Sequence, residues 1–418
     1  MNNLAQKKLL KSEFLSNLEE RHRRGLLWYV LFQIATAMAI VMLVALIATI
    51  VNQSFGLVAI ENKISPSSLT RNGVNLDEMI KEKLVQVLSE NISKGLKRRL
   101  EFERPFSERS KEEIYELIIE RVVDPSVVQA WTLFDSVFSR KDILIFVAGE
   151  FPNAEVKFRS WINKSFIVQA QSSIPEDTGV RAAIKGSLWT IFFAILFAFP
   201  VGVGASIYLE EYAGNTRFNR IIQTNINNLA GIPSIIYGML GLTVFVRSLE
   251  GFTSGAFLGL SQEVSQNGRT VLSAGLTLGL LILPLIIINA QEAIRSVPVS
   301  LRQSSYGLGA TKWQTIWYHV LPQSFDRVLT GTILAMSRAI GETAPMVVVG
   351  ASTFVTLDPA GPFSKFTTLP IQIYQWTARP QVEFRNAAGA AILVLLILLL
   401  SLNATAIFLR NYYARKRR

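Results

Sequence analysis

The sequence of 418 residues contains no cysteine and only two histidines, His22 and His319. Disulfide bonds and thiolate metal sites are therefore excluded, and a metal enzyme is disfavoured because its ligands come mainly from Cys and His. A Gly-x-x-x-x-Gly-Lys-Ser/Thr loop is also missing, which argues against the usual mode of ATP binding. We expect no metal site, no catalytic residues and no cofactor bound by this chain.

The net charge of +11 is unevenly distributed. Residues 52–182 contain 18 Lys and Arg against 19 Asp and Glu, so the whole excess lies in the remaining, apolar part of the chain. A basic rim that faces anionic lipid explains this surplus. Nucleic-acid binding is not indicated.

Long apolar runs dominate outside residues 52–182. Half of the residues are hydrophobic and the mean hydropathy is +0.32, which indicates a membrane protein. Six runs are long enough to cross a bilayer as helices, and the first lacks the small-residue cleavage site of a signal peptide, so it is interpreted as a retained anchor. The six are Leu26–Val51, Gly186–Leu209, Ile226–Val246, Val271–Ala290, Val328–Gly350 and Ala387–Leu409.

The distribution of Lys and Arg around these runs predicts the orientation. The segments 1–26, 210–225, 291–327 and 410–418 together hold seventeen, whereas 247–270 and 351–386 hold two and three. By the positive-inside rule, both termini are expected in the cytoplasm. Residues 52–182 are then expected outside, since long loops cross the membrane largely regardless of charge.

The segment 52–182 is predicted to be a folded α+β domain. Helical periodicity runs through residues 75–100 and 110–123, and Ser110 with Glu113 forms a capping box. Asp142–Ala148 and residues 155–162 are predicted strands. The carboxylates are spread along helix faces as partners of Lys and Arg, which is typical of solvated surfaces.

The loop between the fourth and fifth runs, residues 291–327, is predicted to form two short helices. Pro298 suits a first turn, Gly307 and Gly309 suit a helix end, and Thr311 with Gln314 forms a second capping box.

The second of these helices places four apolar residues at i, i+3, i+4 and i+7, which predicts one apolar face ending at Leu321-Pro322. Two interpretations remain open: a helix that lies among lipid headgroups, or one that fits a groove on a cytoplasmic partner. The four residues are Trp313, Ile316, Trp317 and Val320.

Several motifs carry a resemblance to a known family. The stretch "GLGATKWQTIWYHVLP" resembles half of the EAA loop, the coupling helix that permeases of ATP-binding-cassette (ABC) importers present to their ATPases. Together with "YLEEYA", "NNLAGIPSIIYGMLGL", "SRAIGETAPM" and "LPIQIY", it resembles the PstA-type permeases of bacterial phosphate importers. The similarity covers about residues 183–418.

The resemblance implies a type I importer permease fold and a set of partners. These are a second, PstC-like permease, a PstB-like ATPase dimer that binds ATP and Mg²⁺, a PstS-like phosphate-binding protein and inorganic phosphate. The coupling residues implied are Gln303, Gly309, Ala310, Thr311, Trp313, Ile316, Trp317, Leu321 and Pro322. Two departures stand out. Gln303-Ser304-Ser305 stands where the family has Glu-Ala-Ala, so the ionic contact that the resemblance implies there is lost and at best a hydrogen bond replaces it. Residues 52–182 also form an unusually large insertion.

The fifth run contains two charges, Arg338 and Glu342, one helical turn apart. A charge at that depth costs about 3 kcal/mol on insertion scales, so such residues rarely face lipid. Ser337 and Thr343 flank the pair, and Pro345 is expected to leave the carbonyl of Gly341 free in a continuous helix. Either the two charges form an internal ion pair that fixes helix packing, or they form an anion site on a translocation route.

The sequence thus predicts an all-α polytopic membrane protein with six transmembrane helices and an extracytoplasmic α+β insertion between the first two. Its parts are residues 1–51, 52–182 and 183–418. The predicted function is that of a multi-pass permease subunit for phosphate in the bacterial plasma membrane. A permease for another oxyanion or solute, and a membrane-anchored phosphate sensor or adaptor that uses residues 52–182, are the alternatives.

Overall fold

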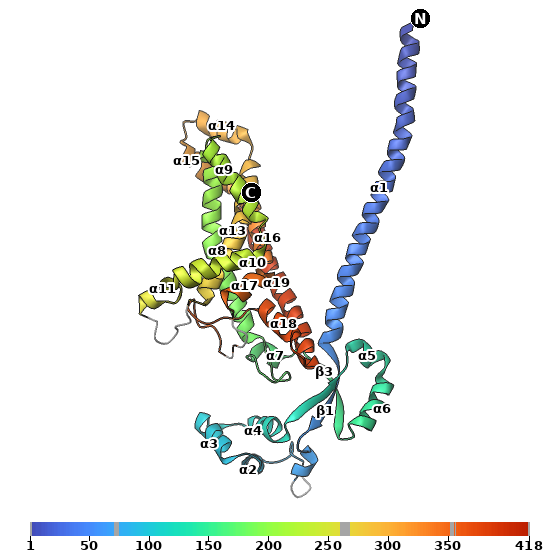
Figure 1. Ribbon diagram of the computed structural model, residues 1–418, viewed down its shortest axis with the longest axis vertical. Helices are drawn as coiled ribbons and strands as arrows, with labels where there is room; N and C mark the ends of the chain where they lie inside the picture. The colour runs from blue at the N-terminus through green and yellow to red at the C-terminus, as the bar shows by residue number, and fades with distance from the viewer. Residues whose placement is uncertain (1, 71–74, 260–267, 352–354, 356, 417–418) are drawn as a thin grey trace. The chain divides into compact units, whose positions relative to one another are not determined.

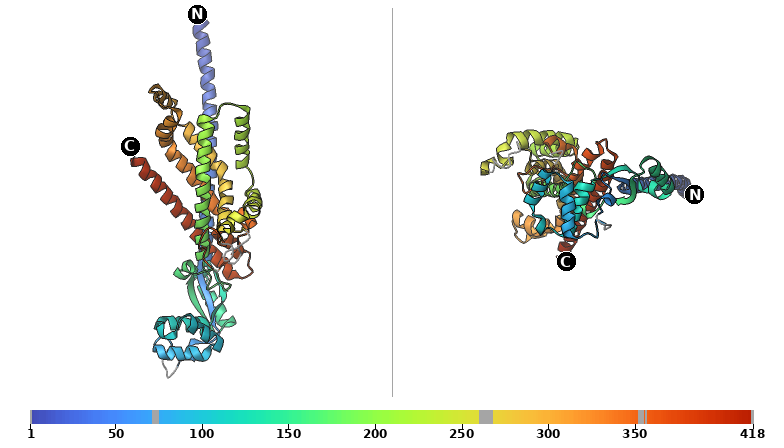
Figure 2. Two further views of the ribbon diagram at one scale, coloured as in Figure 1. Left: turned by 90° about the vertical axis from the view of Figure 1, so that its left-hand side faces the viewer. Right: turned by 90° about the horizontal axis from the view of Figure 1, so that it is seen from below.

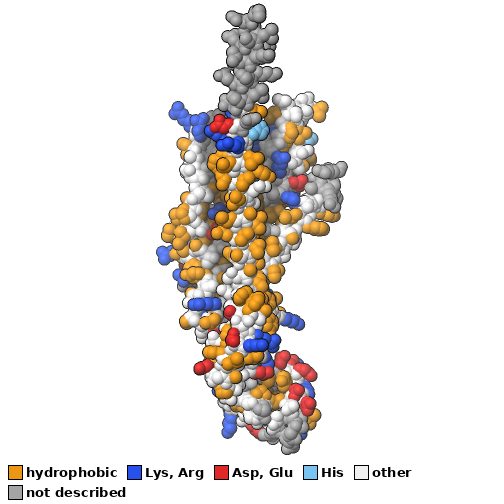
Figure 3. All heavy atoms as spheres, turned by 90° about the vertical axis from the view of Figure 1, so that its right-hand side faces the viewer, with side chains coloured by type: hydrophobic (Ala, Val, Ile, Leu, Met, Phe, Trp, Pro, Cys, Tyr) orange, Lys and Arg blue, Asp and Glu red, His pale blue; other side chains and the backbone are white. Residues whose placement is uncertain are grey.

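The computed structural model describes residues 2–70, 75–259, 268–351, 355 and 357–416 (Figure 1). It divides into two units, Met1–Asn52 and Gln53–Arg418. The first consists of helix α1, which spans Asn2–Ser54; its last two residues already belong to the second unit. Apolar side chains predominate along α1 from residue 25 onward, and only 6% of its most apolar window is buried (Figure 3). Such a helix has the length and composition to cross a membrane.

The second unit begins with a three-stranded antiparallel sheet in the order β2-β1-β3. Strand β1 (Phe55–Asn62) lies between β2 (Pro125–Ala130) and β3 (Ala154–Ser160). Val58 is opposite Ala130 on one side and Lys157 on the other. The strand predicted at residues 155–162 is confirmed as β3.

Alternate residues of β1 face different layers. Leu57 and Ala59 pack on α6 (Arg140–Glu150) through Ile143 and Val147. Asp142–Ala148 is therefore helical, and the prediction of a strand there is wrong. Its apolar residues Ile143 and Val147, spaced i and i+4, lie on one face of a helix and cover the sheet, whose central strand is already paired on both edges.

Beyond the sheet lies a small helical head with its own core. Its capping box at Ser110 and Glu113 is confirmed, with Glu113 N–H donating to Ser110 Oγ at 3.1 Å. The core is formed by side chains such as Met79, Leu84 and Ile114, which are at most 1% exposed. The elements are η1 (Pro66–Leu69), α2 (Lys81–Asn91), α3 (Lys94–Glu103), η2 (Phe106–Glu108), α4 (Lys111–Ile118) and η3 (Ile119–Val123).

The other face of the sheet is buried against the helical bundle. Val58 and Trp161 share a core with Leu369, Trp376 and Phe384, all at most 4% exposed. Residues 52–182 are thus packed onto the bundle through an apolar interface. Short helices α5 (Leu133–Phe138) and α7 (Lys164–Val168) complete this part of the chain.

The bundle is built around α13, which packs between α8 and α16 (Figure 2). Gly275 and Gly279 let α13 approach α8 closely, because an added Cβ would lie 2.5 Å from Phe193 and 2.7 Å from Phe197. The elements are α8 (Arg181–Ile207), η4 (Tyr208–Tyr212), α9 (Arg217–Ala230), α10 (Ser234–Gly241), η5 (Leu242–Ser248), α11 (Glu250–Thr253), η6 (Ala256–Leu258), α13 (Val271–Arg295), α14 (Val299–Gly307), α15 (Lys312–Thr315), η7 (Ile316–Val320), α16 (Leu321–Gly341), α17 (Ala344–Val349), α18 (Leu369–Thr377) and α19 (Val382–Lys416).

Two of the predicted spans are not single helices. The third run breaks at Gly231 and Pro233, where α9 and the following helix meet at 107°. Proline has no N–H and restricts the residue before it, so a helix does not continue through Ile232-Pro233. The fifth run breaks at Glu342 and Thr343. Within the described residues, four helices have the length and hydropathy of a span, or five if the bent pair counts as one.

Candidate functional site

The break in the fifth run places Arg338 and Glu342 at the end of a helix. Helix α16 ends at Gly341, Glu342 is extended (φ −75°, ψ 114°), and α17 starts with Pro345 in its first turn. Proline is favoured in a first turn because its missing N–H has no partner there in any case. The expectation of one continuous helix with a free Gly341 carbonyl is therefore wrong, since Pro345 begins a new helix.

The predicted pair does form. Arg338 Nε lies 3.3 Å from Glu342 Oε1, and the side chains are 48% and 19% exposed. This contact uses Nε, so within the described part of the chain the two Nη groups remain available for another acceptor. The arginine thus lies at the surface of this chain, while the carboxylate is half-buried beside it.

The hydroxyls predicted to flank the pair have different surroundings. Ser337 Oγ donates to the carbonyl of Ile333 and lies 2.6 Å from Asn403 Oδ1 on α19. Ser337 therefore joins two helices and its hydroxyl is occupied. Thr343 lies at the start of α17, where its carbonyl accepts from Met346 N–H at 3.1 Å.

Hydroxyl groups that sequence analysis missed lie on the other side of Glu342. Ser187 and Thr190 of α8, together with Thr368, line a small cavity next to this carboxylate. Thr368 is 4% exposed, and its hydroxyl has no hydrogen-bond partner within the part of the chain that the structure describes. No local sequence signal brings residues 180 positions apart together, so only the tertiary structure reveals this group.

The loop 291–327 forms the two predicted short helices. Helix α14 follows Pro298 and ends at Gly307, and Gly309 has a positive φ of 81°. The capping box of α15 is confirmed: Thr311 N–H donates to Gln314 Oε1 at 2.9 Å, and Gln314 N–H donates back to Thr311 Oγ1.

A buried hydrogen bond joins the two helices. Ser305 Oγ and Thr315 Oγ1 lie 2.9 Å apart, so one of the residues that replaces Glu-Ala-Ala fixes the geometry of the loop. Gln303 is exposed and Ala310 is half-buried. The structure leaves the Gln303 amide accessible to a neighbouring molecule.

The four apolar residues of the second helix do not form one exposed face. Ile316 and Val320 are fully buried, and Val320 packs on Ile294 and Val297. Trp313 and Trp317 are 58% and 53% exposed and stack on each other with ring centroids 5.5 Å apart. The prediction of a single presented face is wrong because the apolar stripe is wide enough to bury one edge and expose the other.

The exposed edge continues into an apolar groove of about 390 Å³. Trp317, Leu321 and Pro322 line it together with Phe199 and Phe325. The exposed surface of the loop is therefore predominantly aromatic and aliphatic where it leaves the bundle.

Two adjacent carboxylates at the end of α8 hold the loop in place. Glu210 accepts from Arg295 Nη2 at 2.5 Å and from its Nε at 3.2 Å. Glu211 Oε1 accepts from Arg302 Nε at 3.0 Å and Nη2 at 2.8 Å. The motif "YLEEYA" thus contacts α13 and α14. The paired acids after one span and the two arginines of a later loop are visible in the sequence, but only the tertiary structure shows that they bind each other.

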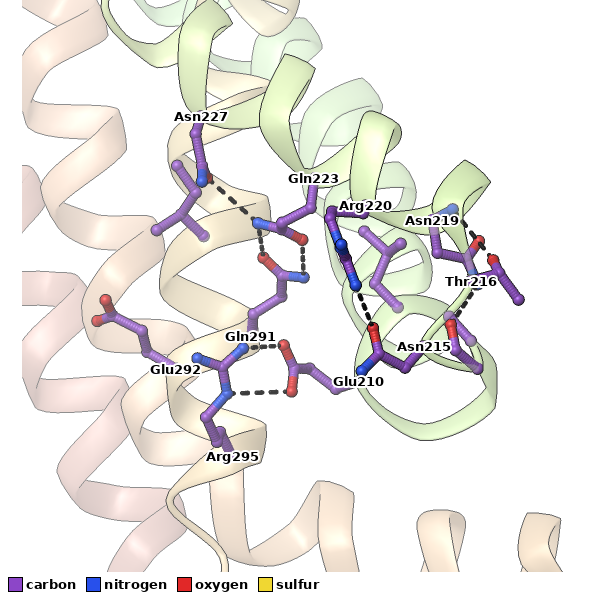
Figure 4. Close-up of a pocket in the computed structure, with 14 residues that line it drawn as sticks. Glu210, Asn215, Thr216, Asn219, Arg220, Gln223, Asn227, Gln291, Glu292 and Arg295 are labelled. Carbon is purple, nitrogen blue, oxygen red and sulfur yellow. Dashed lines mark hydrogen bonds and ion pairs between the residues drawn. The ribbon is translucent and has the colours of Figure 1, made fainter.

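Glu210 and Arg295 also border a polar cavity of about 530 Å³ between α9 and α13 (Figure 4). Gln223 and Gln291 face each other across it and exchange two amide hydrogen bonds of 3.1 and 2.8 Å. Such reciprocal pairs satisfy both amides and fix the spacing of the two helices.

Comparison with known proteins identifies the class. Residues 198–418 match the family described as "Binding-protein-dependent transport system inner membrane component", and the chain belongs to that family. It is a permease component of a transporter rather than an enzyme.

The particular relatives include phosphate permeases. The chain is 34% identical over 242 residues to phosphate transport system permease protein PstA 1 of Mycobacterium tuberculosis, covering 57% of this chain and 72% of that protein. It is 29% identical to the probable ABC transporter permease protein YqgI of Bacillus subtilis, covering 63% and 88%. Phosphate transport system permease protein PstC of Pasteurella multocida is 33% identical over 52% of this chain and 67% of its own length.

Among solved structures, the MetNI methionine ABC transporter in an inward-facing conformation covers 56% of this chain at 16% identity, with a TM-score of 0.39. A bacterial ABC transporter for the acidic polysaccharide alginate covers 67% at 18% identity, with a TM-score of 0.40.

Proposed function

We propose that this chain is the permease subunit of an ATP-driven importer of inorganic phosphate and forms half of its translocation pathway. The observation that carries the proposal is Arg338, a guanidinium in the middle of an apolar run. Its side chain is half exposed, and among the described residues its ion pair is with Glu342. Several relatives are named phosphate transport permeases, which supports the substrate.

Arg338 suits phosphate for a chemical reason. A planar guanidinium can donate two parallel hydrogen bonds to an oxyanion. Glu342 holds the guanidinium when no anion is present and competes with a bound one. Transport requires binding that is favourable yet reversible, and a competing carboxylate provides that balance.

One arginine offsets only part of the charge on phosphate, so a second permease is proposed to face Arg338 across the pathway. Both PstA and PstC proteins are among the relatives, which supports two related permeases. The exposure of Arg338 fits a site completed by another chain.

The remaining partners follow from the class. A phosphate-binding protein delivers the anion outside, and an ATPase dimer that binds ATP and Mg²⁺ contacts the loop 291–327 in the cytoplasm, where both termini also lie. The exposed Trp313 and Trp317 are the proposed anchors for the ATPase, and Gln303 is a proposed hydrogen-bonding contact. The proposed location is the bacterial plasma membrane.

The test is phosphate uptake by the complete transporter in liposomes. Arg338→Ala should lower the kcat/KM of uptake by roughly 10- to 150-fold, the equivalent of losing a charged hydrogen bond. Arg217→Ala, which removes an exposed arginine at the start of α9, is the matched control and should leave uptake unchanged. The phosphate assignment is lost if sulfate or a phosphonate drives uptake and phosphate does not compete.

The sensor alternative concerns the helical head, which has a core of its own. Ile64 N–H donates to the carbonyl of Val123 at 3.3 Å, so residues 65–122 can be replaced by a short glycine linker without stretching the chain. The sheet stays in place because it packs on the bundle. The importer is supported if the head deletion still takes up phosphate. The sensor is supported if Arg338→Ala still takes up phosphate and the head deletion loses signalling.

A further inference from the structure

Three consecutive residues at the end of α8 each hold a different part of the loop 291–327. Glu210 binds Arg295 at the end of α13, and Glu211 binds Arg302 in α14. Lys312 of α15 lies over the ring of Tyr212, with its Nζ 5.2 Å from the ring centroid. Helices α13, α14 and α15 are therefore each connected to one short segment, η4.

The Glu211–Arg302 pair differs from its neighbour in burial and in the number of bonds. The side chains of Glu211 and Arg302 are 7% and 15% exposed, whereas Arg295 is 68% exposed. Arg302 also donates through Nη1 to the carbonyl of Val297 at 2.7 Å and through Nη2 to the carbonyl of Ile294 at 2.9 Å. A shielded guanidinium with four bonds in fixed directions forms a joint that is held rigidly, while the Glu210–Arg295 pair, with two bonds and an arginine that is 68% exposed, is held less firmly.

The joint is connected to the anion site by a single helix. Helix α8 continues into η4 without a break, and its other half carries Ser187 and Thr190, which line the cavity beside Glu342. About 21 helical residues separate Thr190 from Glu211, a distance of roughly 30 Å. A displacement of α14 can therefore reach the surroundings of Glu342 along one continuous helical segment, which contains Pro200.

We propose that Glu211 and Arg302 are positioning residues that transmit the movement of the coupling loop to α8 and so time the opening of the Arg338–Glu342 site. The proposal rests on the function proposed above, in that ATP-driven movement enters at this loop. Glu210 and Arg295 stabilise the same end of the bundle but do not carry the movement, because solvent competes for their bonds.

The experiment uses the complete transporter in liposomes, with Glu211→Gln, Arg302→Gln and the double variant, and with Glu210→Gln as the matched control. The measured quantity is ATP hydrolysed per solute taken up. A lost coupling contact should raise this ratio by roughly 2- to 30-fold, the range expected when coupling changes by a typical amount. The double variant should resemble each single one, since both remove the same joint.

A distance measurement separates this role from a merely structural one. The chain has no cysteine, so Phe192→Cys in α8 and Leu334→Cys in α16, both more than half exposed, can carry a pair of spin labels. Addition of ATP should change the distance in the otherwise wild-type protein and with Glu210→Gln, and should change it much less with Glu211→Gln.

The proposal is overturned if Glu211→Gln gives the same ratio and distance change as Glu210→Gln, or if the two single effects add. Should a single variant not assemble, the double variant, which leaves no lone buried charge, gives the same comparison. The distance change does not depend on which solute is transported, so a failure of the phosphate assignment remains distinguishable.

Discussion

Ser337 on α16 and Asn403 on α19 lie 66 residues apart and are joined by a hydrogen bond of 2.6 Å between their side chains. The contact lies one residue from Arg338, yet it holds two helices together rather than facing an anion. Within the motif "SRAIGETAPM", Ser337 therefore has a structural contact, whereas Arg338 and Glu342 are the residues proposed to act on substrate.

This contact leads to the first prediction. Ser337→Ala should lower the free energy of unfolding by about 1 kcal/mol, the usual net contribution of such a bond. Phosphate uptake per folded transporter should be unchanged, because the hydroxyl is occupied. Thermal unfolding in detergent and uptake in liposomes check the two parts, and a large loss of uptake without a loss of stability would place Ser337 on the pathway after all.

The second prediction concerns Glu342, whose carboxylate competes with the anion for Arg338. Glu342→Gln keeps the size of the side chain and removes its charge, so phosphate should bind more tightly and leave more slowly. The expected result in uptake assays is a lower KM together with a lower kcat. Equal values for the variant and the wild type would show that the carboxylate does not regulate release.

The third prediction concerns the stacked indoles. Replacing Trp313 and Trp317 with Ala should weaken attachment of the ATPase, with each ring worth about 2 kcal/mol if both are central to the interface. Co-purification of the ATPase at several concentrations measures the loss. Phe102→Ala removes an aromatic ring that is 93% exposed in the helical head and serves as control. Intact co-purification with wild-type flux would favour the interpretation that the rings lie among lipid headgroups.

The fourth prediction compares two glycines of the same loop. Gly309 has a φ of 81°, whereas Gly307 is helical, and an added Cβ would meet nothing within 4 Å at either position. Gly309→Ala should therefore cost about 1 kcal/mol through backbone strain alone. Gly307→Ala should be neutral or slightly stabilising, because alanine favours helix. Thermal unfolding measures the stability of both variants. An equal change in stability would contradict the positive φ assigned to Gly309.

The fifth prediction is a dependence of stability on pH. Burial tends to raise the pKa of Asp358, but hydrogen bonds from Lys185 and Arg181, at 2.7 and 3.0 Å, outweigh it and lower the pKa below its ordinary 3.8. A lowered pKa means that the contribution to stability is present above pH 3.8 and is lost as pH falls through the folded-state value.

Asp358→Asn should therefore destabilise the protein at pH 6 and remove part of the loss seen on acidification below about pH 4. Thermal unfolding between pH 6 and pH 3 measures this, with Asp77→Asn, an exposed carboxylate of the head, as control. The same acid profile in the wild type and in Asp358→Asn would rule out the proposed ion pairs.

Much of the architecture could be predicted from local patterns. The capping boxes at Ser110 and Thr311 formed as expected, because each depends on residues three positions apart. The Arg338–Glu342 contact depends on one helical turn and was likewise predictable. In contrast, Asp142–Ala148 was misassigned because its six consecutive apolar residues, 143–148, suit a buried strand or a covering helix equally well.

The sequence by itself determined which segments are apolar enough to enter a membrane, where the local turns and caps lie, and which charges share a helical turn, because these properties depend on neighbours along the chain. Only the tertiary structure decided that Glu211 binds Arg302 and that Thr368 lies beside Glu342. It also divided the apolar stripe of Trp313 and Ile316 into an exposed and a buried edge. Those relations depend on which helices pack together, and packing is set by contacts between residues far apart in the chain.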